Sequence, residues 1–368
     1  MSLQGRSLTD SRRDGKTAIV MHLKYLRQVL MTGLVPVLVV FGCVIGEGSL
    51  AGAPVKVIFD SDMDSDCDDA GAMAVLHALA DKGEVEILAT VTCGRNAWAP
   101  LTISALNTYY GRTNIPVGAP KFNAPLRESK YTRLVADKFP HALRQSEDAE
   151  DAVELYCRVL DQAEDNSVVI LTVGYLSNLS ALLKQSAKGN RPSGMELVRR
   201  KVRQWACMGG NFLGTPARDD LKLGNTNFVV DKEATYYVIK HWPARVMFVG
   251  REIGSVPSGL KAGARLVETP ENNPVRFAYE LYFGGKAKDR HVADPTTVLY
   301  AVRGLGDYWD AHTTGSMDLQ PDMTFEWKEG AACNQGYLLK KRVNGKPNDQ
   351  YIEQTIEGLM IQPPRKSP

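Results

Sequence analysis

Strand-like and helix-like segments alternate along the chain from residue 54 onward. Three short stretches are rich in apolar residues over their whole length, and each precedes a helix-like segment: "VKVIF" (55–59), "EVEILATVT" (84–92) and "SVVILTV" (167–173). Strands of this kind are buried on both faces, which is typical of a parallel sheet between layers of helices. We therefore predict an α/β fold with a mostly parallel central sheet covered by helices on both faces, in a single domain over residues 54–368.

The pattern changes after about Gly315, where strand-like and turn-like residues dominate. The stretch "CNQGYLLKKRVNG" (333–345) resembles a hairpin. We predict a small strand-and-turn extension at the C-terminal end of the domain.

The first 53 residues differ from the rest of the chain. Cations in "HLKYLRQVL" (22–30) precede the apolar run "LMTGLVPVLVVFGCVIG" (30–46) and the small residues "AGA" (51–53). This order is typical of a secretory signal, so we predict a signal peptide, or a leader with a misassigned start, and a periplasmic or secreted mature protein. A lipid anchor at Cys43 is less favoured because Phe41 is bulky. No stable membrane span is expected, since Pro36 and glycines interrupt a short run.

The charges of the chain are nearly balanced. There are 44 Lys and Arg against 42 Asp and Glu, a net charge of +2. This balance does not favour a polyanionic partner, so we expect a small-molecule ligand and no nucleic acid. A homo-oligomer is compatible with the sequence, which leaves the oligomeric state open.

Six aspartates occupy ten positions directly after the first predicted strand: Asp60, Asp62, Asp64, Asp66, Asp68 and Asp69. Carboxylates this close together cannot all stay ionised near neutral pH unless a cation compensates them or some take up protons. A hard divalent cation held by oxygen ligands is the simplest compensation. Ca²⁺ suits flexible, carboxylate-rich geometry better than Mg²⁺ does.

Three other interpretations compete with a calcium site. An EF-hand loop that starts at Asp60 would need Gly where Ser65 stands. The DxD motif of a haloacid-dehalogenase-like phosphohydrolase would make Asp60 a nucleophile, but Asp64 stands where Thr or Val is usual. One or two aspartates capping the helix near Ala70 would be ordinary, but six exceed that role.

Polar or glycine-rich loops follow four of the predicted strands. They are the aspartate cluster, "CGRN" (93–96), "GYLSN" (174–178) and "GGN" (209–211). Parallel sheets bind ligands outside the carboxyl ends of their strands, so we expect the four loops to converge at one edge of the sheet.

Four segments resemble, in order, motifs of the nucleoside hydrolase family, the inosine-uridine-preferring nucleoside N-ribohydrolases and their relatives. "DSDMDSDCDDAGAM" (60–73) is similar to the longer form of the N-terminal signature, "DTDMGNDVDDALAL". "VVILTVGYLSNLSALL" (168–183) is similar to the strand followed by "GPLTNIA". The segment "MGGNFLGTPARDDLKLGNTNFVVDKEA" (208–234) resembles "MGG…EFN…DPEA", and "ADPTTVLYAV" (293–302) resembles "HDPLAVAYL".

The resemblance implies a Ca²⁺ site made by Asp62, Asp69, the backbone carbonyl of Val173 and Asp294. Asp62 would also be the base that activates a metal-bound water, and Asp60 would brace the loop. Hydrolysis of an N-glycosidic bond needs water at C1′ as the sugar becomes oxocarbenium-like. A cation that lowers the pKa of that water and a carboxylate that takes its proton meet this need.

The resemblance also implies a set of substrate-binding residues. Asp68 would bind the ribose hydroxyls, helped by Asn96 and Asn227, and Asn211 would lie near the 5′ end of the sugar.

The chain departs from the family on the substrate side. Asn225 stands where the family has a Glu that binds the sugar, and Glu252 is a candidate to supply the missing carboxylate. Ala293 stands where many members have the His that protonates the leaving base, and His291 is the candidate substitute. We predict Ca²⁺-dependent hydrolysis of a nucleoside or a related ribosyl compound. The alternatives are the phosphohydrolase and a non-catalytic, Ca²⁺-dependent ribosyl-binding protein.

Overall fold

The computed structural model describes residues 52–64, 66–213, 226–255 and 259–365. Nearly all of the predicted leader and the predicted sugar-binding residue Asn225 lie outside these ranges. Residues Ala51–Pro368 form one compact unit. Within the described ranges, no helix combines the length and apolar character needed to cross a membrane.

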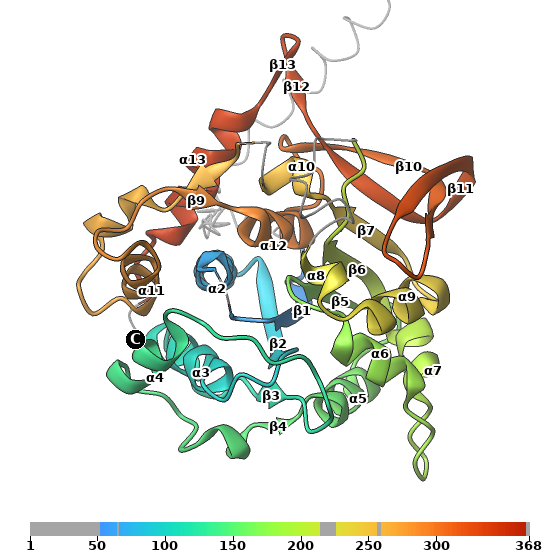
Figure 1. Cartoon of the computed structure of the whole chain (residues 1–368), viewed down its shortest axis with the longest axis horizontal. Coiled ribbons are helices and arrows are strands. Elements are labelled where there is room, and N and C mark those ends of the chain that lie inside the picture. Colours follow the sequence, from blue (N-terminus) through green and yellow to red (C-terminus); the bar gives the residue numbers. More distant parts are fainter. Residues whose placement is uncertain (1–51, 65, 214–225, 256–258, 366–368) are drawn as a thin grey trace, which may run out of the picture. The chain divides into compact units, whose positions relative to one another are not determined.

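A nine-stranded sheet forms the centre of this unit, in the order β10-β11-β7-β6-β5-β1-β2-β3-β4 (Figure 1). All neighbouring strands are parallel except β10 and β11. The strands are β1 (Val55–Ser61), β2 (Val85–Thr92), β3 (Val117–Ala119), β4 (Glu150–Asp151), β5 (Val168–Thr172), β6 (Val202–Met208), β7 (Val246–Val249), β10 (Trp309–Leu319) and β11 (Phe325–Lys340). The short pairs β8 (Lys261–Ala262) with β9 (Arg290–His291), and β12 (Arg342–Val343) with β13 (Lys346–Pro347), lie outside the main sheet.

Alternate residues of the central strands enter two separate hydrophobic cores. On β1, Val57 and Phe59 pack into one core, whereas Ile58 packs into the other. Leu171 and Ile170 of β5 divide in the same way. Successive side chains of a strand point to opposite faces, so a strand covered on both sides has no polar face. This explains the nearly continuous apolar runs and confirms the predicted α/β fold.

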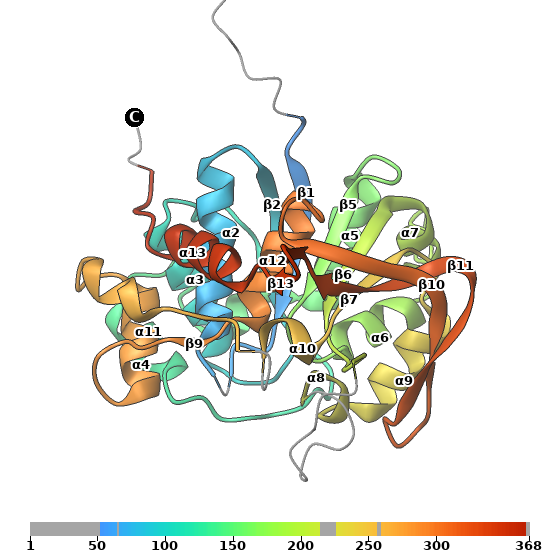
Figure 2. The same ribbon diagram turned by 90° about the horizontal axis from the view of Figure 1, so that it is seen from above.

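Helices cover both faces of the sheet, as the two views show (Figures 1 and 2). The first core includes residues of α2 (Asp68–Asp81), α3 (Ala99–Tyr109), α4 (Thr132–Lys138), α11 (Pro274–Phe283), α12 (Ala293–Arg303) and α13 (Asp349–Met360). The second includes residues of α5 (Ala152–Gln162), α6 (Ser177–Lys184), α7 (Gly194–Lys201) and α9 (Lys232–His241). The short helices α8 (Thr226–Val229) and α10 (Arg251–Gly254) follow the ends of strands near the site.

The predicted C-terminal extension is present, and it joins the main sheet. Strands β10 and β11 form an antiparallel hairpin, and β11 adds to β7 with Tyr337 opposite Phe248. The sequence analysis did not anticipate α13, which buries Ile352, Ile356 and Met360 against the first core. These residues recur at helical spacing, so the helical signal was present in the sequence.

Candidate active site

The four loops predicted to converge do so at the carboxyl ends of β1, β2, β5 and β6. The amide of Cys93 donates to the carbonyl of Ser61 at 3.0 Å. Asn178 Nδ2 donates to the carbonyl of Thr92 at 2.9 Å. Gly174 makes the close approach possible, because a Cβ there would lie 2.4 Å from the amide nitrogen of Asp62. One edge of the sheet therefore carries the aspartate loop and its neighbours.

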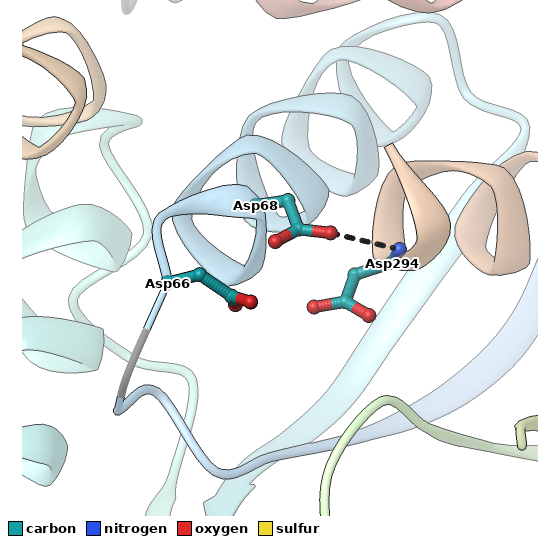
Figure 3. Close-up of side chains that lie close together, drawn as sticks. All are labelled: Asp66, Asp68 and Asp294. Carbon is teal, nitrogen blue, oxygen red and sulfur yellow. Dashed lines mark hydrogen bonds between the residues drawn. The ribbon is translucent and has the colours of Figure 1, made fainter. Parts of the chain in front are cut away.

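Five carboxylates gather where this edge meets the first turn of α2. Asp62, Asp68, Asp69 and Asp294 are buried, with at most 8% of each residue exposed. Asp66 is half-buried, and its side chain is 36% exposed. We call these five residues the acidic wall. Asp294 comes from the start of α12, which packs beside α2, so the wall joins the two ends of the domain sequence (Figure 3).

The four buried carboxylates of the acidic wall, those of Asp62, Asp68, Asp69 and Asp294, hold their protons unusually tightly in the absence of a cation. Burial, followed by repulsion from the neighbouring aspartates, raises the pKa of Asp62, Asp68 and Asp294 well above the usual range. Burial and the charge of Asp66 raise the pKa of Asp69 to about 7. A cation placed among these groups would relieve both effects.

The turn between β1 and α2 is fixed by hydrogen bonds to Asp69. The Ser61 hydroxyl donates to Asp69 Oδ1 at 2.5 Å, and the Met63 amide donates to the same oxygen at 3.2 Å. Met63 has φ of 47°, in the left-handed region that non-glycine residues rarely adopt. Its fully buried side chain accepts a hydrogen bond from the Tyr131 hydroxyl at 3.3 Å. Packing therefore holds a turn that the backbone alone disfavours.

Asp60 points away from the acidic wall and into the second core. The Tyr156 hydroxyl donates to its Oδ2 at 2.8 Å, and Asn178 Nδ2 lies within 3.2 Å of both carboxylate oxygens. These contacts agree with the bracing role that the resemblance implied. They argue against Asp60 as the nucleophile of a phosphohydrolase, because both oxygens are held inside the protein.

The predicted calcium ligands form a suitable set of hard oxygen donors. Asp62 and Asp69 lie within hydrogen-bonding reach of each other, and the charges of both raise the pKa of Asp294. The Val173 carbonyl accepts a hydrogen bond from Asn227 Nδ2 at 2.8 Å, which leaves its second lone pair available. Buried carboxylates whose repulsion is otherwise uncompensated fit a divalent cation with oxygen ligands.

The predicted sugar-binding residues fall into two groups. Asp68 belongs to the acidic wall, and Asn227 bridges the ends of β5 and β6 through the carbonyls of Val173 and Met208, the latter at 3.2 Å. Asn96 is used locally instead: its Oδ1 accepts from the Trp98 amide at 2.9 Å, and its Nδ2 lies 3.4 Å from the Thr132 hydroxyl. To bind a sugar, Asn96 would have to give up its longer hydrogen bond, the one from Nδ2 to Thr132, for a bond to the sugar.

Asn211 and Glu252 lie together at the ends of β6 and β7. The Phe212 amide, next to Asn211, donates to Glu252 Oε2 at 3.3 Å, and the Arg251 amide donates to the Gly210 carbonyl at 3.0 Å. Burial raises the pKa of Glu252 to about 7. Its Oε1 has no hydrogen-bond partner among the described residues. The structure thus places the buried carboxylate of Glu252 beside Phe212, the residue that follows Asn211.

His291 lies on β9, paired with Lys261 of β8. Its Nδ1 is 3.2 Å from an Arg290 nitrogen. Burial and the nearby cations Arg290, Lys261 and Arg251 lower its pKa to about 4. A histidine with this pKa is neutral at pH 7, which disfavours it as the proton donor for a leaving base.

The sequence analysis missed two features of the site. Arg290 donates to Asp66 Oδ2 at 2.7 Å, so one member of the acidic wall is paired with a cation from β9. Phe212 stacks on Tyr337 of the C-terminal hairpin, with ring centroids 4.6 Å apart and planes at 6°. Both contacts join segments far apart in the sequence. In the sequence, only the repeated aromatic residues of β11 hinted at the contact between Phe212 and Tyr337.

The model of the inosine-uridine preferring nucleoside hydrolase family matches residues 57–351, most of the chain. The chain belongs to this family. It is therefore a hydrolase that acts on N-glycosyl compounds, as the four resembling segments predicted. Comparison with curated proteins gives no significant match.

Solved structures of nucleoside hydrolases share the fold. The inosine-uridine preferring nucleoside hydrolase of Bacillus anthracis is 15% identical with a TM-score of 0.58, and the match covers 83% of this chain and 99% of that one. The purine-preferring ribonucleoside hydrolase of Gardnerella vaginalis is also 15% identical, with a TM-score of 0.59 and the same coverage. The type III effector protein XopQ, solved with adenosine diphosphate ribose, is 14% identical with a TM-score of 0.57, covering 85% of this chain and 94% of that one. At these identities the likeness concerns the fold.

Proposed function

We propose that this nucleoside hydrolase cleaves the N-glycosidic bond of a nucleoside or a related ribosyl compound in a Ca²⁺-dependent reaction. The observation that carries the proposal is the acidic wall, in which the loop after β1 and the start of α12 bring buried carboxylates together, and Asp62 lies against Gly174, the residue after Val173. Asp62, Asp69, Asp294 and the Val173 carbonyl would hold the ion. When bound, Ca²⁺ would polarise water and fix the vicinal sugar hydroxyls.

The side chains of the wall supply the remaining chemistry. Asp62 would accept a proton from the water that attacks C1′, since a carboxylate relieved of its neighbours' repulsion is a competent base. Asp68 and Asn227 would bind the ribose hydroxyls. Asn211 and Glu252 would contact the 5′ end of the sugar, with Glu252 taking the place of the acidic residue that Asn225 replaces.

Neither position considered for the leaving-group acid, Ala293 or His291, is suited to donate a proton. Ala293 has no proton to give, and His291 is neutral at pH 7 because nearby cations lower its pKa to about 4. A substrate with an activated leaving group should therefore react much faster than an ordinary nucleoside, because it departs without protonation.

Two alternatives remain distinguishable. A phosphohydrolase would use Asp60, but the contacts of Asp60 with Tyr156 and Asn178 and the family match both argue against it. A ribosyl-binding protein that has lost catalysis would bind nucleosides tightly without turnover.

The test is sugar release from a nucleoside panel and from p-nitrophenyl riboside, with Ca²⁺ or with a chelator. We expect Ca²⁺-dependent release, fastest from the nitrophenyl compound, and its loss in Asp62→Asn. Release that persists after chelation would refute the Ca²⁺ requirement. Binding of nucleosides without cleavage of any substrate would favour the ribosyl-binding alternative.

We also propose, from the sequence alone, that the protein is exported to the periplasm or secreted. Its basis is the signal-like order of cations, apolar run and small residues before residue 54. Cell fractionation with sequencing of the mature N-terminus would test this. A cytoplasmic protein that retains residues 1–53 would contradict it.

A further inference from the structure

A partly buried cation lies beside the acidic wall, and the reaction outlined above does not use it. Arg290 lies on β9, just before α12 begins at Ala293. Its Nη2 donates to Asp66 Oδ2 at 2.7 Å, and its side chain is 21% exposed. The carbon of its guanidinium lies over the Tyr282 ring, 5.4 Å from the ring centroid. Asp66 and Tyr282 therefore hold a positive charge in a defined place next to the site.

The guanidinium of Arg290 keeps hydrogen-bonding capacity for a ligand. Each terminal nitrogen of a guanidinium carries a pair of N–H groups. Nη2 uses one of them for Asp66, and Nη1 lies 3.2 Å from His291 Nδ1. Nε has no hydrogen-bond partner among the residues that the structure describes. Arginine also keeps its charge at ordinary pH, so it can stabilise a negative charge but cannot supply a proton.

Two further cations add to the positive potential around Arg290. Lys261 lies opposite His291 in the pair of β8 and β9, and Arg251 begins α10, which contacts α12. Burial, followed by these three cations, lowers the pKa of His291 to about 4, whereas Asp66 has a smaller opposite effect. The cations that remove the proton from this imidazole would favour an anion at the same place.

A sugar bound as proposed would point its leaving group toward Arg290. Asn211 and Glu252, at the ends of β6 and β7, would hold the 5′ end of the sugar. The 5′ carbon and the base are attached on opposite sides of the ring oxygen, so the base points away from these two strands. Asp66, which binds Arg290, follows β1, and β5 separates β1 from β6 in the sheet (Figure 1). Arg290 therefore lies on the side of the leaving group.

We propose that Arg290 stabilises the leaving group as an anion and that Asp66 positions the guanidinium, an inference that rests on the proposed function. Water forms a bond to C1′ while the bond from C1′ to the leaving atom breaks. The electron pair of the broken bond stays on the leaving atom, where the guanidinium binds the negative charge. The proton of the water goes to Asp62 and then to solvent, and the released anion takes up a proton from solvent. Charge stabilisation thus replaces a leaving-group acid.

The test uses ribosides of similar shape with increasingly acidic leaving groups: phenyl, chlorophenyl and p-nitrophenyl riboside. We expect kcat/KM of Arg290→Gln to fall roughly 10²- to 10³-fold for the phenyl compound, the usual effect of losing one preorganised donor. The fall should be much smaller for the nitrophenyl compound, because its anion needs little stabilisation. Arg290→Lys keeps a positive charge and should lose less rate on the phenyl compound than Arg290→Gln does.

The matched control is Arg112→Gln. Arg112 pairs with Asp81 at the other end of α2, and its side chain is 22% exposed, nearly the same as that of Arg290. Any fall in rate in this variant should be equal for the three ribosides. A lower folded fraction likewise reduces all three rates by one factor, so loss of stability does not imitate the expected result.

Equal falls for the three ribosides in Arg290→Gln would overturn the inference and leave the proposed function intact, since the wild type would still cleave them. The same dependence on the leaving group in Arg112→Gln would also overturn it. A wild-type protein that cleaves no riboside and no nucleoside would contradict the proposed function, and the inference with it.

Discussion

The acidic wall and the ends of β6 and β7 hold their polar groups in different ways. In the acidic wall, buried carboxylates lie close together and repel one another. At the ends of β6 and β7, the Phe212 amide binds Glu252, and the Phe212 ring packs on Tyr337, Phe325 and Trp327 of the C-terminal hairpin. We call Asn211, Phe212, Glu252 and Tyr337 the aromatic wall.

This difference between the two walls suggests different roles: the acidic wall for the chemical step, and the aromatic wall for substrate recognition. The acidic wall retains the ligands that the family resemblance implies, and its buried carboxylates repel one another. The aromatic wall contains Glu252, the candidate for the carboxylate that Asn225 replaces in the sequence, and packing from a late segment of the chain supports this wall. A change in the first should therefore alter catalysis and metal binding, whereas a change in the second should alter how well substrate binds.

The largest expected effect is that of Asp62→Asn. We expect hydrolysis to fall roughly 10²- to 10⁴-fold, the usual contribution of a general base. The metal-free protein should be no less stable than the wild type, because the change removes a charge from a repulsive group. Initial rates of sugar release and thermal unfolding without Ca²⁺ would measure both effects. Equal loss of rate in Asp64→Asn would show that loop charge, and not the base, is responsible.

The second effect is stabilisation by Ca²⁺, which should grow between about pH 4 and pH 8. The folded-state pKa values of the four buried aspartates of the acidic wall are raised, to about 7 for Asp69, whereas unfolded aspartates titrate near 3.8. The metal-free protein therefore loses stability as pH rises through this window, while bound Ca²⁺ replaces the protons.

At 1,000 times its Kd, Ca²⁺ would contribute about 4.1 kcal/mol to the free energy of unfolding. The measurement is the difference in Tm with and without Ca²⁺ across that pH range. This difference in Tm cancels contributions that the metal-free and metal-bound forms share. One of them comes from buried His77, whose pKa is lowered from 6.5 to about 3, so that it destabilises the fold as the pH falls below 6.5. A difference independent of pH would contradict the ligand assignment.

A smaller effect is expected for Glu252→Gln in the aromatic wall. The pKa of Glu252 is raised from 4.5 to about 7, so the ionised carboxylate costs stability above that pH. The variant should be more stable than the wild type at pH 8, by at most about 3 kcal/mol, and should match it below pH 5. Unfolding at the two pH values tests this. Because Glu252 is proposed to bind the sugar, KM should also rise.

The smallest effect is expected for Tyr337→Ala. Without the Tyr337 ring, Phe212 is held less firmly, and substrate binding should weaken by about 0.5–1.5 kcal/mol. This corresponds to a rise in KM of roughly two- to tenfold with little change in kcat. Tyr337→Phe keeps the ring and is the matched control. A fall in kcat with unchanged KM would place the aromatic wall in the chemical step and remove the contrast with the acidic wall.

The sequence predicts those parts of the molecule that depend on local pattern. Each apolar strand ends at polar or glycine residues, so convergence of the loops at one edge followed from strand direction alone. Asp294 could be added only through the family resemblance, because nothing local links it to Asp68. The contact of Arg290 with Asp66 and that of Phe212 with Tyr337 depend on how β9 and β11 dock, and no periodicity specifies such long-range pairing.

The position of Asp294 also determines when the site can exist. More than two hundred residues separate it from Asp68, yet a carboxylate oxygen of each lies within 4.8 Å of the other. During synthesis, the loop after β1 emerges early and carries its negative charges without the ligand that completes the group. Cation binding therefore becomes possible only after α12 has formed and docked on α2. In this protein, calcium would stabilise the fold only after the chain has been made as far as α12, which precedes the C-terminal hairpin and α13.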